Sequence, residues 1–326
     1  MRKLIIQIPC FNEEETLGKT LSALPRTVAG FDKVEWLVID DGSRDGTVRV
    51  ARECGVEHII SLPHNRGLAR AFMVGLEASL KAGADVIVNT DADNQYDASC
   101  IPALVAPILA GRAQVVIGER PIMSVQDFSL VKKLLQRLGS AVVKLASNTS
   151  IPDAPSGFRA IHADAALQMS VFSDYSYTLE TIIQAGRNNI AITSVPVTVN
   201  LVTRPSRLVR SIPSYVRRSL LTIIRIFILY KPFRFFLYLG TLFMLPGLAI
   251  GVRFFVSYLE GQGQGHIQSL ILAAVLLVTA AVVYAAGIIA DLTAANRTLL
   301  EEVRMRLLRE EIARTQAGNG DRRTGP

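Results

Sequence analysis

The chain has 326 residues, half of them hydrophobic, and a formal net charge of +7 at pH 7. Its mean hydropathy of +0.32 is high for a purely soluble enzyme, and the excess lies toward the C-terminus. This length allows one sizeable core and an appendage. The three cysteines and four histidines show no disulfide or metal-ligand spacing, which argues against a zinc site and is typical of a reducing compartment.

The first part of the chain predicts buried strands that end in polar residues. Apolar runs at 4–8, 36–39 and 86–88 are typical of strands covered on both faces. The residues that follow them are Pro9, Asn12 and Glu13, then Asp40 and Asp41, then Asp91 and Asp93. Ligands of open α/β sheets bind beyond the carboxyl ends of the strands, so we expect a nucleotide site there.

Asp91 and Asp93 form an Asp-x-Asp (DxD) pattern directly after the third of these strands. Mg²⁺ uses one or two carboxylates together with substrate phosphates. Alone, the pattern suits a solvated turn better, because Asp and Asn favour turns. The other acidic strand ends favour a metal-held nucleotide diphosphate, since neither a Walker-type Gly-Lys-Ser/Thr nor a Gly-x-Gly-x-x-Gly follows a strand.

Five short motifs follow one another along the chain in a particular order. They are Pro9-x-x-Asn12-Glu13, Asp40-Asp41-Gly42-Ser43-x-Asp45, Asn65-x-Gly67, Asp91-x-Asp93-x-Gln95, and PDAPSGFRA at 152–160. In this order they resemble the family 2 glycosyltransferases. The last motif is similar to the dolichol-phosphate mannose synthase branch, which moves sugars onto polyprenyl phosphates. The resemblance covers roughly residues 1–210 and implies an α/β catalytic domain of the GT-A type, with a Rossmann-like, mostly parallel sheet.

The resemblance also implies roles on the donor side. Asp93 is expected to contact a bound Mg²⁺ or Mn²⁺, and Asp91 and Gln95 complete the cluster or contact the ribose. Asp40 is expected to recognise the base, with its neighbour Asp41 as the alternative. The loop with Pro9, Asn12 and Glu13 assists in this recognition.

A phosphate acceptor needs a cationic cradle more than a base, because its second pKa is about 6 and it is already an anion at neutral pH. Arg120 and Lys132 fall where the resembling synthases place acceptor-phosphate residues, although Lys132 is equally well explained as an exposed helix lysine. Arg204, Ser206 and Arg207 match the family's basic segment and are expected to close over the donor diphosphate and acceptor phosphate. This segment is shorter than the common Arg-x-Gly-x-Ser-Lys, and Arg does not replace Lys neutrally at a phosphate.

Two further acids are candidates for chemistry. Asp153 and Glu180 could each act as a base or contact the sugar, and Glu180 equally suits a role in orienting a helix under the site. The Gln-x-x-Arg-Trp motif of processive polysaccharide synthases is absent, because the only tryptophan is Trp36, in a predicted strand. Transfer of a single sugar is therefore expected.

Two apolar segments, about 235–258 and 269–290, are each long enough to cross a hydrocarbon core of about 30 Å. Neither shows a polar face, which argues against buried core helices. Basic residues crowd the outer flanks, and the link at 260–266 has no Lys or Arg. The positive-inside rule therefore predicts an integral membrane protein with two spans and with both termini and the catalytic domain cytoplasmic. The run at 4–8 is too short for a signal peptide.

Residues 211–234 combine arginines with apolar residues at helical spacing. This pattern predicts an amphipathic juxtamembrane helix on anionic lipids, and lipid is a better partner than nucleic acid because the basic residues flank membrane spans. Residues 291–326 predict a cytoplasmic helix and a disordered tail. Whether that helix is a solvated cap or mediates homo-oligomer formation stays open.

The sequence thus predicts a catalytic domain at 1–210, a juxtamembrane helix at 211–234, a transmembrane hairpin at 235–290 and a cytoplasmic end. The expected reaction transfers one sugar from a UDP- or GDP-sugar to an undecaprenyl- or dolichyl-type phosphate, with metal-assisted inverting chemistry. The alternatives are an enzyme of the same fold acting on a lipid-linked oligosaccharide or another glycan, and a non-catalytic scaffold subunit. A transporter is disfavoured, because two spans without buried charges make a poor pathway.

Overall fold

The computed structural model describes residues 1–121, 149, 151–171, 177–200, 221, 224–225, 228–261 and 267–321. The chain divides into two compact units. The first comprises residues Met1–Ser211 together with Glu301–Pro326, and the second comprises Ile212–Leu300.

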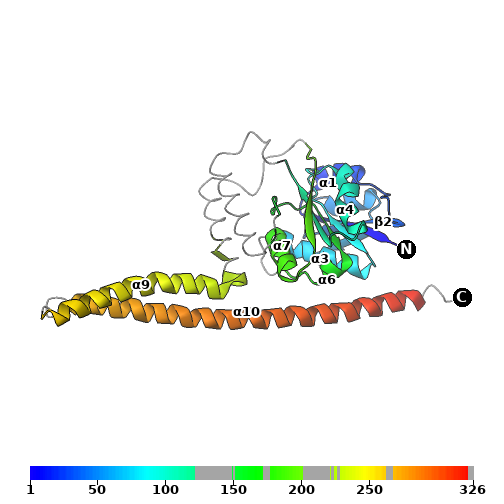
Figure 1. The fold of residues 1–326 in the computed structure, drawn as a ribbon. Coiled ribbons are helices and arrows are strands. Elements are labelled where there is room, and N and C mark those ends of the chain that lie inside the picture. The colour runs from blue at the N-terminus through cyan, green and yellow to red at the C-terminus, as the bar shows by residue number, and fades with distance from the viewer. Residues whose placement is uncertain are drawn as a thin grey trace. The chain divides into compact units, whose positions relative to one another are not determined.

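A seven-stranded sheet forms the centre of the first unit (Figure 1). Its strands are β1 (Lys3–Cys10), β2 (Lys33–Asp40), β3 (His58–Ser61), β4 (Val86–Asn89), β5 (Val115–Glu119), β6 (Arg159–His162) and β7 (Ile192–Pro196), in the order β3-β2-β1-β4-β6-β5-β7. All neighbours are parallel except β6, which runs antiparallel to both β4 and β5. The predicted mostly parallel α/β sheet is confirmed. The carboxyl ends of β1, β2, β4 and β5 therefore meet at one edge.

Helices cover both faces of this sheet, which explains why β1, β2 and β4 are buried almost from end to end. One face carries α1 (Glu14–Ala23), α2 (Thr47–Glu53), the short η1 (Ala98–Cys100) and α4 (Ile101–Leu109). The other carries α3 (Leu68–Lys81), α6 (Ala163–Leu167) and α7 (Tyr177–Arg187). Gly75 lets α3 lie close to the sheet, since a Cβ there would be 2.5 Å from Gln7 Oε1.

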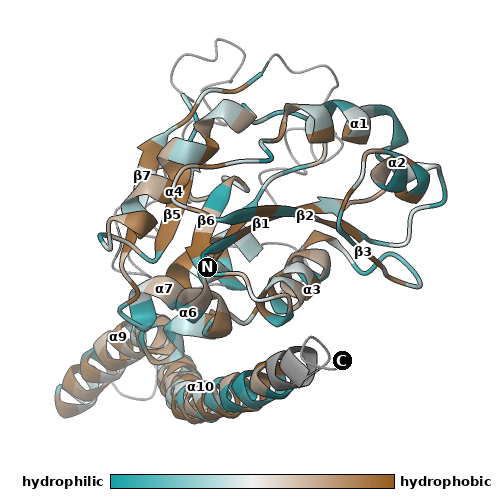
Figure 2. Cartoon of the chain, turned by 90° about the vertical axis from the view of Figure 1, so that its right-hand side faces the viewer, coloured by the Kyte–Doolittle hydropathy of each residue, from teal (hydrophilic) through white to brown (hydrophobic). Residues whose placement is uncertain are grey.

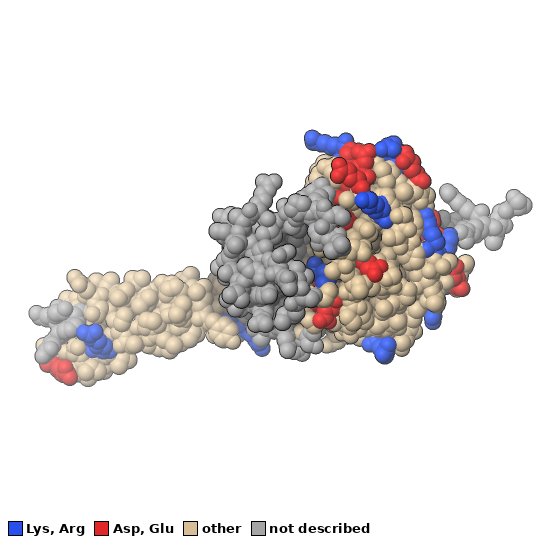
Figure 3. All heavy atoms as spheres, turned by 90° about the horizontal axis from the view of Figure 1, so that it is seen from above, with Lys and Arg blue, Asp and Glu red and all other residues tan. Residues whose placement is uncertain are grey.

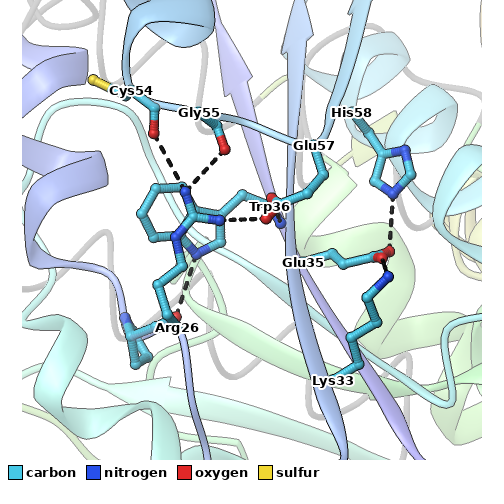
Figure 4. Close-up of polar contacts among 9 residues, drawn as sticks. Arg26, Lys33, Glu35, Trp36, Cys54, Gly55, Glu57 and His58 are labelled. Carbon is cyan, nitrogen blue, oxygen red and sulfur yellow. Dashed lines mark hydrogen bonds and ion pairs between the residues drawn. The ribbon is translucent and has the colours of Figure 1, made fainter.

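Charged side chains gather at the amino ends of the outer strands (Figure 4). Glu35, whose side chain is 5% exposed, pairs with Lys3 at 3.2 Å, with His58 at 2.9 Å and with Lys33. Burial by itself raises the pKa of Glu35, but the hydrogen bonds from Lys33, His58 and Lys3 outweigh it and lower the pKa to about 2.

A second group of contacts in Figure 4, the Trp36 cluster, consists of Arg26, Trp36 and Glu57. The Arg26 guanidinium lies 3.2 Å from the centre of a Trp36 ring and also pairs with Glu57. It donates a further hydrogen bond of 2.9 Å to Gly55 O. These contacts join the segment after α1 to the turn before β3.

The second unit contains α9 (Pro232–Leu259) and most of α10 (Ile267–Asp321). Among the described residues, these two helices are long and apolar enough to cross a membrane, and they contain the expected spans. Figure 3 shows few charged atoms along the middle of this pair, and in Figure 2 α10 becomes more hydrophilic toward its C-terminal part. The expected second span and the expected cytoplasmic helix are one continuous helix.

Small residues hold α9 and α10 together. A Cβ on Gly240 would lie 2.5 Å from the Tyr284 ring, and a Cβ on Gly287 would lie 2.7 Å from Phe236 Cβ. The hydroxyl groups of Thr241 and Tyr284 are 3.0 Å apart and share a hydrogen bond. Close backbone approach and interhelical hydrogen bonds are what stabilises helix pairs in lipid.

Residues 301–321 of α10 belong to the sheet unit. Arg304 donates to Met169 O at 3.0 Å and pairs with Glu77 of α3 at 2.5 Å. One turn further along α3, Lys81 pairs with Glu311 at 2.6 Å, and Leu308 between these contacts is buried. The end of α10 is thus packed against α3.

Candidate active site

The acidic pair Asp91 and Asp93 follows the carboxyl end of β4. Asp93 Oδ1 accepts a hydrogen bond of 3.1 Å from Gln95 N, and Asn94 adopts a left-handed φ of 56° in the turn between them. The Asp91 carboxylate oxygens lie 3.1 and 3.2 Å from the point where a Cβ on Gly157 would stand. Asp91 is therefore held against the loop that precedes β6.

Among the residues that the structure describes, none forms an ion pair with Asp91 or Asp93. Burial raises the pKa of Asp91 to about 6, and the charge of Asp93 adds to this rise, while Arg120 and Arg159 oppose it. A desolvated carboxylate beside a second carboxylate suits a hard divalent cation. Within the described part of the chain, no third His, Cys, Asp or Glu joins them. Water and substrate oxygens would have to complete the coordination, as is usual for Mg²⁺.

The loop that carries Asp91 and Asp93 is held in place by the segment that follows β7. Asn200 N donates to Gln95 O at 2.8 Å, and Asn200 Nδ2 donates to Asn94 O at 2.9 Å. Tyr96 forms a β-bridge with Val199. The predicted phosphate-binding residues Arg204, Ser206, Arg207 and Lys132 lie outside the described residues.

The loops after β1 and β2 are joined by side-chain hydrogen bonds. Asn12 Oδ1 accepts from Arg44 N, and Ser43 Oγ accepts from Asn12 N, both at 2.9 Å. Glu13 N donates to Thr47 Oγ1 at 2.9 Å. Pro9 lies within β1, opposite Ile39 of β2. The structure thus brings the expected base-recognition loop beside Asp40 and Asp41.

Asp40 and Asp41 differ in how their oxygens are used. Asp41 accepts from Arg66 N and Gly67 N, one to each oxygen, both at 2.8 Å, and so fixes the loop before α3. Asp40 accepts from Ser43 N with Oδ1 at 2.8 Å. Among the described residues, Asp40 Oδ2 has no partner, and this oxygen is the one left for a ligand.

Arg120 follows β5 and forms a bidentate ion pair with Asp153. Nε donates to Oδ2 at 2.8 Å and Nη2 donates to Oδ1 at 2.9 Å. Burial lowers the pKa of Arg120, but the hydrogen bond with Asp153 outweighs it, so the pKa is raised overall. The Asp153 side chain is 1% exposed against 24% for Arg120. Asp153 therefore orients Arg120, whose side chain is the more exposed of the two.

Glu180, the other candidate acid, is buried within α7. A buried side chain on this helix suits the orienting alternative better than direct contact with a sugar. Gln95 is held through its backbone, by Asp93 and by Asn200.

A buried polar network beneath Asp91 escaped the sequence analysis. Gln7 Nε2 donates to Asn89 Oδ1 at 2.9 Å, and Asn89 Nδ2 donates to Gly157 O at 2.8 Å and to the Tyr177 hydroxyl at 3.3 Å. Arg159, also fully buried, begins β6 directly beside Asn89. Gln7 and Asn89 are polar residues inside otherwise apolar strands, and that interruption was a signal available from the sequence.

Charged side chains at the carboxyl ends of parallel strands are where open α/β sheets bind their ligands. The profile of the family described as Glycosyl transferase family 2 matches residues 5–168, and the chain belongs to this family of glycosyltransferases.

Relatives and solved structures agree with this assignment. The chain is 30% identical over 209 residues to an undecaprenyl-phosphate mannosyltransferase of Micrococcus luteus, covering 61% of this chain and 83% of that one. It is 27% identical over 215 residues to a UDP-N-acetylglucosamine–dolichyl-phosphate N-acetylglucosaminyltransferase of Methanococcus voltae, covering 58% and 82%. A crystal structure of glucosyl-3-phosphoglycerate synthase from Mycobacterium tuberculosis with Mn²⁺ and UDP has the same fold. Its TM-score is 0.54 at 22% identity, over 68% of this chain and 80% of that one.

Proposed function

We propose that this glycosyltransferase moves one sugar from a nucleotide diphosphate sugar to a polyprenyl phosphate at the cytoplasmic face of a membrane. The observation that carries the proposal is the placement of two opposite charges at one sheet edge. The acidic pair follows β4, and Arg120 follows β5. The activities for which the Micrococcus and Methanococcus relatives are named support a polyprenyl phosphate as the acceptor class.

On the donor side, Asp91 and Asp93 would hold Mg²⁺ or Mn²⁺, and the Mn²⁺ and UDP in the structural neighbour support this. A cation held there would neutralise the negative charge of the diphosphate leaving group. Asp40 offers its Oδ2 to the base, and Asp41 keeps the neighbouring loop in place. The two relatives are named for the transfer of different sugars, so the sugar of the donor has to be identified by experiment.

On the acceptor side, Arg120 binds the phosphate. Asp153 engages Nε and Nη2, so the Nη1 group is directed to a substrate oxygen. An acceptor phosphate is already an anion at neutral pH and needs no base. Arg120 therefore contributes by orienting one phosphate oxygen toward the anomeric carbon, on the side opposite the leaving diphosphate. This displacement inverts the anomeric configuration.

The apolar helices α9 and α10 support a membrane location for the acceptor. We infer that they span the membrane as a hairpin and that residues 211–234 lie on its cytoplasmic surface. Among the described residues of that segment, Leu221, Ile224, Ile228 and Phe233 are exposed, as a lipid-facing surface requires, whereas Leu229 is half-buried and Tyr230 is buried.

An acceptor panel tests the proposal. Detergent-purified protein would be incubated with GDP-mannose, UDP-glucose or UDP-N-acetylglucosamine and with undecaprenyl phosphate, dolichyl phosphate, a lipid-linked oligosaccharide or undecaprenol. Labelled lipid is expected only with the two phosphates and with one donor. Labelling of the oligosaccharide alone would assign the alternative acceptor, and no labelling with an intact fold would favour the scaffold function.

A further inference from the structure

Arg159 is a buried arginine that has no acidic partner among the described residues. Its side chain is 0% exposed, and within the described part of the chain it forms hydrogen bonds only to neutral groups, while its Nε has no partner. Buried arginines are nearly always paired with a carboxylate, because removing the charge from water costs several kcal/mol. Burial accordingly lowers the pKa of Arg159.

The Arg159 guanidinium joins two segments of the chain. Nη2 donates to Ser156 O in the loop before β6. Nη1 donates to Thr181 Oγ1 at 2.6 Å in the first turns of α7, and the guanidinium carbon lies 5.4 Å from the centre of the Tyr177 ring. Only a planar guanidinium group, with donors on both terminal nitrogens, makes these contacts together.

The position of Arg159 in the sheet is equally specific. It is the register partner of Asn89 in β4 on one side and of Ile117 in β5 on the other. Asp91 lies two residues beyond Asn89, and Arg120 lies three residues beyond Ile117. Asp91 and Arg120 thus follow the two strands that flank Arg159 in the sheet.

The loop that Arg159 holds contacts both charged groups, and the helix lies close to one of them. The loop carries Asp153, which holds Arg120, and Gly157, which lies against Asp91. The helix begins with Tyr177, whose hydroxyl lies 2.9 Å from the same point beside Gly157 that the Asp91 oxygens approach to 3.1 and 3.2 Å.

We propose that Arg159 is a positioning residue, which fixes Asp91 and the Arg120–Asp153 pair relative to one another without touching a substrate. The inference rests on the proposed function in that Asp91 and Asp93 hold a divalent cation. A change at Arg159 then alters the metal site although the residue is not a ligand.

Mn²⁺ binding to the full-length protein in detergent, followed by electron paramagnetic resonance without donor or acceptor, tests this. Arg159→Lys keeps the positive charge but loses the planar guanidinium. Thr181→Val removes the hydroxyl that accepts from Arg159 and keeps nearly the same side-chain shape. The Mn²⁺ dissociation constant is expected to rise about 10-fold in Arg159→Lys and about 3-fold in Thr181→Val, as for residues that support metal ligands. Thr181→Val alone decides the question if Arg159→Lys does not fold.

Arg26→Lys is the matched control, because Arg26 also joins two segments but belongs to the Trp36 cluster (Figure 4). It is expected to lower the melting temperature and to leave Mn²⁺ affinity unchanged. Wild-type affinity in both Arg159→Lys and Thr181→Val, equal weakening in Arg26→Lys, or a wild type that binds no Mn²⁺ would overturn the inference. A wild type that binds Mn²⁺ but transfers no sugar contradicts the proposed function instead, and the variant comparison still decides the role of Arg159.

Discussion

Arg120 and Asp153, 33 residues apart in the chain, share two hydrogen bonds of 2.8 and 2.9 Å. The Arg120 backbone N–H adds a third contact to the same carboxylate at 3.2 Å. The pair joins the end of β5 to the loop before β6. A guanidinium held along one edge presents its other edge in a fixed direction, which suits recognition of a phosphate.

Asp153→Asn is expected to weaken acceptor use more than donor use. Asparagine accepts with only one oxygen, so Arg120 loses its fixed orientation. The kcat/KM for the polyprenyl phosphate should fall roughly 10- to 100-fold, because orientation is what Arg120 contributes. Steady-state kinetics with each substrate varied in turn measure the effect, with Arg120→Lys as the variant that removes the bidentate geometry from the other side. An unchanged acceptor KM and kcat in Asp153→Asn would show that the pair does not serve the acceptor.

The neighbours Asp40 and Asp41 should respond differently to the same substitution. Asp41→Asn places an amide nitrogen against Arg66 N or Gly67 N and is expected to lower the free energy of unfolding by about 1–3 kcal/mol. Asp40→Asn keeps the bond from Ser43 N and is expected to change stability little, while the donor KM rises about 10-fold, the loss of roughly one hydrogen bond. Thermal unfolding and donor titration of both variants separate the two roles. A loss of stability in Asp40→Asn together with a raised donor KM in Asp41→Asn would mean that Asp41, and not Asp40, recognises the base.

The strands that carry the site were predictable because each is a mostly apolar run with polar or acidic residues at its end or shortly after it. The pairing of Arg120 with Asp153 was not, since it depends on β6 entering antiparallel between β4 and β5. No local pattern specifies that insertion. The same strand brings Arg159 beneath the site, so the network around it became visible only with the sheet order.

The choice between Asp40 and Asp41 also needed the structure. Both follow β2, and both are nearly buried. They differ only in their partners, and Asp41 takes its partners from a loop about 25 residues further along the chain. By contrast, the continuity of α10 beyond residue 290 had a local cause, because residues 288–316 contain neither Gly nor Pro to end a helix.

Acid should weaken the sheet unit through Glu35. Its folded pKa of about 2 lies below the ordinary value of 4.5, so its stabilising contribution is complete above pH 4.5 and is lost as the pH falls toward 2. A shift of this size corresponds to at most about 3 kcal/mol. Melting temperatures of wild type and Glu35→Gln should therefore differ most near neutral pH and converge as the pH falls below 4.5. A difference that stays constant down to pH 3 would contradict this assignment.

The packing of α10 on α3 can be tested by exchanging a charge pair. Arg304→Glu faces Glu77 with a like charge and leaves Met169 O without its donor. It should lower stability by about 1 kcal/mol, a modest value because both side chains are about one-third exposed. Combining it with Glu77→Arg is expected to restore the ion pair and part of the stability. Thermal unfolding of the two single variants and the double variant gives the coupling, and purely additive effects would mean that the pair contributes nothing.

The most direct test of the central claim is the release of nucleoside diphosphate by wild type and by Asp93→Asn, with Mn²⁺, in the presence and absence of a polyprenyl phosphate. Wild type is expected to release it from one sugar nucleotide and only when the lipid phosphate is present. Asp93→Asn is expected to fold normally and to be at least about 100-fold slower, because it lacks a carboxylate of the site where charge builds. Release at equal rates from both proteins, or release that ignores the lipid, would contradict the proposed reaction.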